Sequence, residues 1–342
     1  MNRRSLILAA AAAASSCNRT QKKTIGMVPK GRTHVFWQSV QAGAIAASRE
    51  VGVDVSWNGP ATETDFNGQI QIVDAMINRK VDAICLAPID KKSMVGVVNR
   101  AIDAKIPVII FDSGLDTDRF SSQISTDNYA AGSLAAARMG EVLQGKGKVV
   151  IVAVQPGVAS TMAREAGFEE TLAKQFPGIV IADKRYGNAD YAQSLKVAEN
   201  MLTAHADLTG VFASNESSTA GASQAVKARG TKCKLVGFDS SAQLLEDLRV
   251  GVIDSLVAQH PFKMGYESVM TALKVTRGEA VEKIQNIVPM LVTQQNLNDP
   301  EVQARLTPDL KKYLNSSSGG AGEAEFAGRS PGSAPWARWQ SM

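Results

Sequence analysis

The sequence has few of the residues and none of the local signatures that mark catalytic or metal sites. Its 342 residues include three cysteines and three histidines, and no pair has metal-ligand spacing. No G-x-S-x-G or G-x-G-x-x-G follows a strand-like run, and no H-E-x-x-H occurs. GEVLQGKG, at 140–147, has the spacing of a phosphate loop but follows a helix and precedes a strand, so it does not present a helix N-terminus to an anion. We expect no enzyme activity, no cofactor and no metal, although a triad assembled only in space would leave no such signature.

Concentrated charge is also missing. The net charge is +4 and the basic residues are scattered, which argues against nucleic acid as a partner. Cys85 and Cys233 lie in or beside apolar, strand-like runs, where buried free thiols are expected instead of a disulfide. His205 falls near the end of a helical segment, where it needs no ligand role.

Both ends of the chain differ from its centre. Residues 1–23 combine positive charge at Arg3 and Arg4 with an apolar stretch too short to span a bilayer, which indicates an export signal. The small residues before Cys17 resemble a lipoprotein signal, but Ala14 replaces the leucine-like residue of that pattern, so lipidation of Cys17 stays open. We expect a monomer in the periplasm or anchored there by lipid. Residues 316–342 are rich in Gly, Ser, Ala and Pro and are expected to be disordered.

From Thr24 onward, short apolar strands alternate with amphipathic helical segments. Strands that are apolar on both faces indicate parallel sheets covered by helices, an α/β architecture. The expected strands are 25–28, 53–57, 83–87, 108–111, 149–154, 179–182, 210–213, 235–238 and 256–258. The expected helices are 36–50, 67–78, 93–104, 129–143, 164–175, 191–204, 218–227 and 262–275.

An internal repeat suggests two lobes of similar construction. Pro88 and Asn215 each end a strand, and Asp112 and Asp239 each follow 24 residues later within a Phe-Asp-Ser sequence. Ligands of open α/β sheets bind beyond the carboxyl ends of strands, which is where both aspartates lie. Asp, Asn, Gln and Arg side chains satisfy hydroxyl groups well, and an aromatic ring covers the apolar face of a sugar. These positions therefore favour a polyhydroxylated ligand.

Six segments occur in order along about 24–315: IGMVPKGRTHVFWQSVQAGA, SSQISTDNYAAG, STMAREAGF, GVFASNESSTAGA, KLVGFDS and SLVAQHPFKMG. Together they resemble one family, the periplasmic sugar-binding proteins of ABC transporters, of the ribose-binding or type I group. The resemblance implies two Rossmann-like lobes joined by a three-segment hinge near Asp127, Gln259 and Val288. It places 24–127 plus 260–288 in the first lobe and 128–259 plus 289–315 in the second.

The resemblance also implies a set of ligand-binding residues. The first lobe would contribute Lys30, His34, Phe36, Trp37, Asp112 and Ser113, the second lobe Arg164, Asn215 and Asp239, and the hinge Gln259. The aspartates would accept protons from ligand hydroxyls, Arg164 and Asn215 would donate, and Phe36 or Trp37 would stack on the ring. Each residue also has an ordinary structural reading, with the two aromatic side chains as core and Asp112 as a helix cap.

Two departures from the ribose-type pattern bear on the ligand. Ser113 stands where those members carry an arginine, and the second-lobe aromatic residue has no equivalent, its position falling near Ala189 and Tyr191. Pro29 and Lys30, with GVDVSWNGP, look more like rhamnose-binding and autoinducer-2-binding members. The sequence is therefore as consistent with a deoxysugar, a sugar alcohol or a furanose-like polyol as with an ordinary pentose or hexose.

The implied function is capture of a sugar or polyol by hinge closure and delivery to an ABC permease. A receptor subunit that presents its ligand to a membrane signalling partner would look the same in sequence. A sugar-responsive transcription regulator would need a helix-turn-helix before the sensor, which residues 1–23 do not provide.

Overall fold

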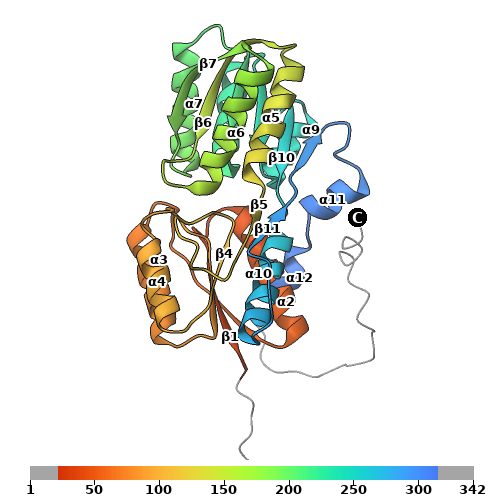
Figure 1. Ribbon diagram of the computed structural model, residues 1–342. Helices are drawn as coiled ribbons and strands as arrows, with labels where there is room; N and C mark the ends of the chain where they lie inside the picture. The colour runs from red at the N-terminus through yellow and green to blue at the C-terminus, as the bar shows by residue number, and fades with distance from the viewer. Residues whose placement is uncertain (1–21, 315–342) are drawn as a thin grey trace, which may run out of the picture.

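Two α/β lobes are stacked one above the other and joined by crossing chain segments (Figure 1). A computed structural model describes residues 22–314, so the expectations for the export signal, Cys17 and the tail fall outside the described residues. Within 22–314, no helix is long and apolar enough to cross a membrane.

The first lobe is built on a six-stranded parallel sheet with the strand order β11-β5-β4-β3-β1-β2. Helices α2 and α10 cover one face of the sheet, and α3 and α4 cover the other. Each pair of helices packs over its own apolar core. The elements are β1 (Thr24–Val28), α2 (Val35–Val51), β2 (Asp54–Trp57), α3 (Phe66–Asn78), β3 (Ala83–Leu86), α4 (Val95–Asp103), β4 (Val108–Phe111), β5 (Ser122–Thr126), α10 (Pro261–Thr276) and β11 (Ile284–Ile287).

The second lobe repeats this plan with the order β12-β10-β9-β8-β6-β7. Its strands are parallel except for β12, which pairs with β10 in the antiparallel sense. Two α/β lobes with mostly parallel sheets confirm the expected fold class. The elements are α5 (Asn128–Val142), β6 (Lys146–Ala153), α6 (Ala159–Gln175), β7 (Gly178–Tyr186), α7 (Tyr191–Ala204), β8 (Gly210–Ala213), α8 (Glu216–Arg229), β9 (Lys234–Phe238), α9 (Ala242–Arg249), β10 (Ser255–Ala258) and β12 (Met290–Thr293).

The chain passes between the lobes at three places: after β5, after β10 and between β11 and β12. The last two helices, α11 (Pro300–Leu306) and α12 (Leu310–Leu314), divide between the lobes. Leu306 of α11 joins the core of the second lobe, whereas α12 packs on α2, where Arg49 donates to the carbonyl of Lys312 at 3.1 Å. The assignment of all of 289–315 to the second lobe therefore does not describe α12.

Glycine allows the helices of each lobe to approach closely. A Cβ at Gly43 of α2 would lie 1.9 Å from the carbonyl oxygen of Phe262 in α10, and a Cβ at Gly132 of α5 would lie 1.9 Å from that of Arg164 in α6. No side chain fits at such distances, so the glycines fix both helix pairs. The second contact holds the backbone that carries Arg164.

The thiols of Cys85 and Cys233 are buried and free, as expected. Cys85 and Cys233 form no disulfide, and burial raises the pKa of Cys85. The loop after α5 lies between a helix and a strand, which confirms that GEVLQGKG is not a phosphate loop. His205 is the C-cap of α7.

Candidate functional site

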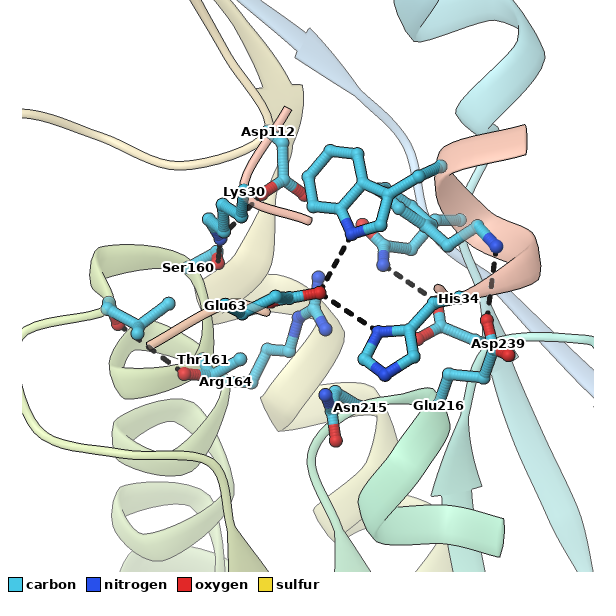
Figure 2. A pocket seen from close by; sticks show the side chains of 14 residues that line it. Lys30, His34, Glu63, Asp112, Ser160, Thr161, Arg164, Asn215, Glu216 and Asp239 are labelled. Carbon is cyan, nitrogen blue, oxygen red and sulfur yellow. Dashed lines mark hydrogen bonds and ion pairs between the residues drawn. The ribbon is translucent and has the colours of Figure 1, made fainter. Parts of the chain in front are cut away.

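A cavity of about 30 Å³ lies between the lobes at the carboxyl ends of the strands (Figure 2). Nine of the ten predicted ligand-binding residues line it: Lys30, His34, Phe36, Trp37, Asp112, Arg164, Asn215, Asp239 and Gln259. Ser113 is not among the lining residues; its hydroxyl accepts a hydrogen bond from the backbone N–H of Ser160 at 3.1 Å. The structure thus gathers residues up to 229 positions apart around one space.

The two strand-end aspartates occupy equivalent positions in the two lobes. Asp112 follows β4 and Asp239 follows β9, with φ angles of 62° and 70° in the left-handed region. Aspartate is one of the few residues that tolerate this backbone conformation. The matching geometry accounts for the Phe-Asp-Ser repeat in the sequence.

Lys30 links the first lobe to the second. Its ammonium lies 2.6 Å from Asp112 Oδ2 and donates to Ser160 Oγ, on the first turn of α6, at 3.0 Å. Both Lys30 and Asp112 are nearly inaccessible to solvent. A buried ammonium requires such a partner, so the pair places one donor and one acceptor group in the cavity wall.

His34 belongs to a network that sequence reasoning did not find. Glu63, in the loop before α3, lies 2.9 Å from His34 Nδ1 and accepts from Trp37 Nε1 at 2.8 Å. Burial lowers the pKa of His34, but the hydrogen bond and charge of Glu63 outweigh this and raise it to about 9. Burial likewise opposes ionisation of Glu63, but His34 and Lys30 hold its pKa below the ordinary value. The pair is therefore ionised at neutral pH.

Phe36 and Trp37 form part of the first-lobe core as well as the cavity wall. Their rings pack edge to face at 4.9 Å, and both side chains are at most 9% exposed. The bond from Trp37 to Glu63 fixes the orientation of the indole. Their role as a stacking platform for a ring remains a prediction.

Arg164 enters from the second lobe with two of its five N–H donors already used. Nε donates to Asn128 at 2.8 Å, Nη1 donates to the carbonyl of Ser214 at 2.9 Å, and the guanidinium lies 4.5 Å from the ring centroid of Phe238. Burial lowers the pKa of Arg164, an effect opposed by the charges of Asp239 and Asp112. The guanidinium is held rigidly with its charge directed at the cavity.

Asp239 and Gln259 join the second lobe to the hinge. Gln259 donates to Asp239 Oδ1 at 2.8 Å and accepts from Thr126 Oγ1 at 2.8 Å, at the first crossing. Burial raises the pKa of Asp239 to about 6, although Arg164 and the bond from Gln259 pull it down. Burial therefore makes this carboxylate costly to ionise.

Five further residues line the cavity that the sequence did not identify: Glu63, Val158, Ser160, Thr161 and Glu216. The helix expected to begin at Arg164 begins at Ala159, which brings Ser160 and Thr161 into its first turn. Glu216 follows Asn215 directly, so an acidic residue beside a predicted strand-end amide was the available signal. Tyr191 lies just outside the cavity and donates to Glu216 at 2.6 Å.

Several backbone and side-chain bonds close the cavity across the lobes. Gln155 donates to the carbonyl of Glu63 at 3.0 Å, and the backbone N–H of Lys91 donates to the carbonyl of Gly157 at 2.9 Å. Among the described residues, no group of three or more His, Cys, Asp or Glu side chains is arranged to hold a metal ion. The two lobes are thus held together around a polar cavity whose lining offers hydrogen-bond donors and acceptors.

Comparison with known proteins points in the same direction. Residues 25–280 match a family described as periplasmic binding protein domain. The D-ribose/D-allose-binding protein of Pseudomonas aeruginosa is 30% identical over 272 residues, which cover 77% of this chain and 85% of that protein. The ribose import binding protein of Escherichia coli is 28% identical over 291 residues, covering 84% of this chain and 96% of that protein.

Solved structures of the same kind superimpose closely. A carbohydrate transporter solute binding protein from Agrobacterium radiobacter, in complex with D-arabinose, has a TM-score of 0.82 and 34% identity and covers 84% of this chain and 100% of that one. An ABC transporter solute binding protein from Agrobacterium vitis with bound D-fucose has a TM-score of 0.80 and 34% identity, covering 83% and 100%.

Proposed function

Because the chain belongs to the periplasmic binding protein family, we propose that it captures a monosaccharide or similar polyol between its lobes and delivers it to an ABC importer. One observation carries the proposal: charged and amide side chains from both lobes converge on a single cavity at the strand ends. Its relatives are named for binding ribose and allose, or were solved with arabinose and fucose.

The cavity offers the mixture of groups that a polyol needs. A hydroxyl both donates and accepts, and here Asp112 and Asp239 supply acceptors while Arg164, Lys30 and Asn215 supply donors. All five are at most 8% exposed, so their hydrogen bonds to ligand form with little competition from water. Both positive and negative side chains line the space, which suits a neutral ligand better than a strongly charged one.

Ligand capture works through lobe closure. The three crossings act as the hinge, and a ligand that contacts both walls stabilises the closed form because the open form offers it only one wall. The closed pair of lobes then presents the surface that an importer recognises. We infer that the protein changes no bond of its ligand, acts as a monomer in the periplasm, and touches the membrane at most through a lipid on Cys17.

A thermal-shift screen tests the proposal. The full chain is heated with pentoses, hexoses, deoxysugars and polyols, each at about 100 times a typical dissociation constant, where binding raises the unfolding free energy by about 2.7 kcal/mol. We expect at least one carbohydrate to raise the melting temperature. A shift produced by amino acids and by no carbohydrate would contradict the sugar assignment.

Delivery and turnover are checked separately. Uptake of the identified sugar should fall in cells that lack this chain and return when it is supplied. The bound sugar should be recovered unchanged after long incubation with the protein. Chemical conversion of the sugar would contradict a purely binding role.

A further inference from the structure

Helix α2 begins at the cavity without a cap from its own lobe. Its N-cap residue, His34, makes no side-chain capping bond, and its first turn contains no acidic residue. The first N–H groups of a helix have no partner within the helix, and their dipole favours a negative charge. The start of α2 is therefore a binding position for a carboxylate.

Glu216 of the other lobe occupies this position (Figure 2). Its two carboxylate oxygens accept hydrogen bonds from the backbone N–H groups of Val35 at 3.3 Å and Phe36 at 3.1 Å. The residue is 2% exposed and begins α8, so it reaches across the cleft to cap a helix 180 positions earlier in the chain. The capping interaction spans the two lobes.

Tyr191 holds the carboxylate ready for this contact. Its hydroxyl donates to Glu216 Oε1 at 2.6 Å, and burial and the charge of Glu216 raise the pKa of the phenol, which keeps it a donor. Tyr191 and Glu216 both belong to the second lobe, so their bond survives when the lobes separate. The two bonds to α2 exist only when the lobes are closed.

We propose that Glu216 is the closure residue of this protein: it caps α2 in trans and so sets ligand affinity by stabilising the closed form. The inference rests on the proposed function, since it assumes that closure traps the ligand. Weakening the cap lowers the closed fraction, and the apparent dissociation constant rises in inverse proportion to that fraction. Every ligand should therefore lose affinity by the same factor.

The test compares Glu216→Gln with Glu199→Gln in the full chain. Both changes remove one carboxylate charge from a helix of the second lobe, but Glu199 lies on the exposed face of α7. Tyr191→Phe serves as a second variant that removes only the positioning bond. Dissociation and association rates are measured by stopped-flow fluorescence with D-ribose, D-arabinose and D-fucose.

We expect Glu216→Gln to speed dissociation of each sugar that binds by about tenfold, to change association less than threefold, and Tyr191→Phe to act in the same direction. A loss confined to one sugar would instead make Glu216 a ligand contact, and unchanged dissociation would refute its role. The glutamine retains the shape of the side chain, so a folding defect is not expected.

Hydrogen exchange provides a reading that needs no ligand. The amides of Val35 and Phe36 should exchange faster in Glu216→Gln than in the wild type or in Glu199→Gln. Equal exchange rates in all three proteins, with and without sugar, would refute the cap. If no sugar binds the wild type, the proposed function fails, while the exchange comparison still decides whether Glu216 caps α2.

Discussion

Replacing Asp239 by asparagine should stabilise the ligand-free protein and destroy its affinity for sugar. Asparagine keeps an oxygen for the 2.8 Å bond from Gln259 and tolerates the left-handed backbone at this position, where φ is 70°. What it removes is a buried negative charge. The variant therefore separates the effect of this charge on the free energy of unfolding from its effect on ligand affinity.

The magnitude follows from the pKa of Asp239, which burial raises from 3.8 to about 6. Between these values the folded protein binds more protons than the unfolded chain, so the wild type loses stability as the pH rises through this window. Each tenfold difference in proton affinity corresponds to 1.36 kcal/mol, which gives about 3 kcal/mol at pH 7. Asparagine does not titrate and escapes this loss.

Urea unfolding of the wild type and Asp239→Asn between pH 4 and 8, without ligand, measures the effect. The variant should match the wild type near pH 4 and exceed it by up to about 3 kcal/mol at pH 7. Asp118→Asn, on an exposed loop, should show no such difference. A variant that is less stable at pH 7, or a difference that does not change with pH, would refute the reasoning.

Binding should change in the opposite direction. Hydrogen bonds to a charged group contribute about 1.5–3 kcal/mol each, so loss of two of them weakens binding at least about a hundredfold. Calorimetry with the sugar identified by thermal shift measures this. Wild-type affinity in Asp239→Asn would remove Asp239 from the ligand-binding residues.

Two further predictions concern the first lobe. Glu63 raises the pKa of His34 to about 9 against the effect of burial. Protonated His34 therefore stabilises the fold by about 3 kcal/mol below pH 6.5, and this contribution is lost as the pH rises through 9. The unfolding free energy of His34→Gln, measured in urea, should change less between pH 7 and 10 than that of the wild type, and an equal change in both proteins would contradict the ion pair. Gly43→Ala should destabilise by about 3 kcal/mol or more because its Cβ meets a carbonyl oxygen at 1.9 Å. Gly96→Ala, whose nearest atom lies 3.8 Å away, should stabilise the protein by up to about 1 kcal/mol, and equal effects of both would argue against the close approach.

The sequence predicted the central strands and most helices because those segments have strong periodic patterns. The expected strands at 108–111 and 210–213 and the helix at 191–204 match the structure. Strands β5 (SQIST) and β11 (IQNI) were not predicted because they are rich in polar residues, and the apolar β12 (MLVT) was also missed. Their pairing depends on neighbours far along the chain, which no local pattern records.

The residues of the cavity also divide into those that the sequence predicted and those that it did not. Residues at strand ends, such as Asp112 and Asp239, could be placed from topology alone, because the carboxyl ends of parallel strands meet at one edge. Glu63 and Glu216 could not, since the first lies in a loop with no periodicity and the second faces a helix of the other lobe. The local sequence does not record a partner in the other lobe, so the position of Glu216 beside Asn215 was the one signal available for it.

The three crossings also constrain the order in which the protein can fold. The first lobe needs α10 on α2 and β11 beside β5, yet residues 261–287 are synthesised after almost all of the second lobe. A chain emerging N-terminus first therefore cannot complete its first lobe until nearly the whole sequence is available. This late dependence favours long-lived unfolded chains, the form in which a polypeptide can still pass through a narrow translocation channel.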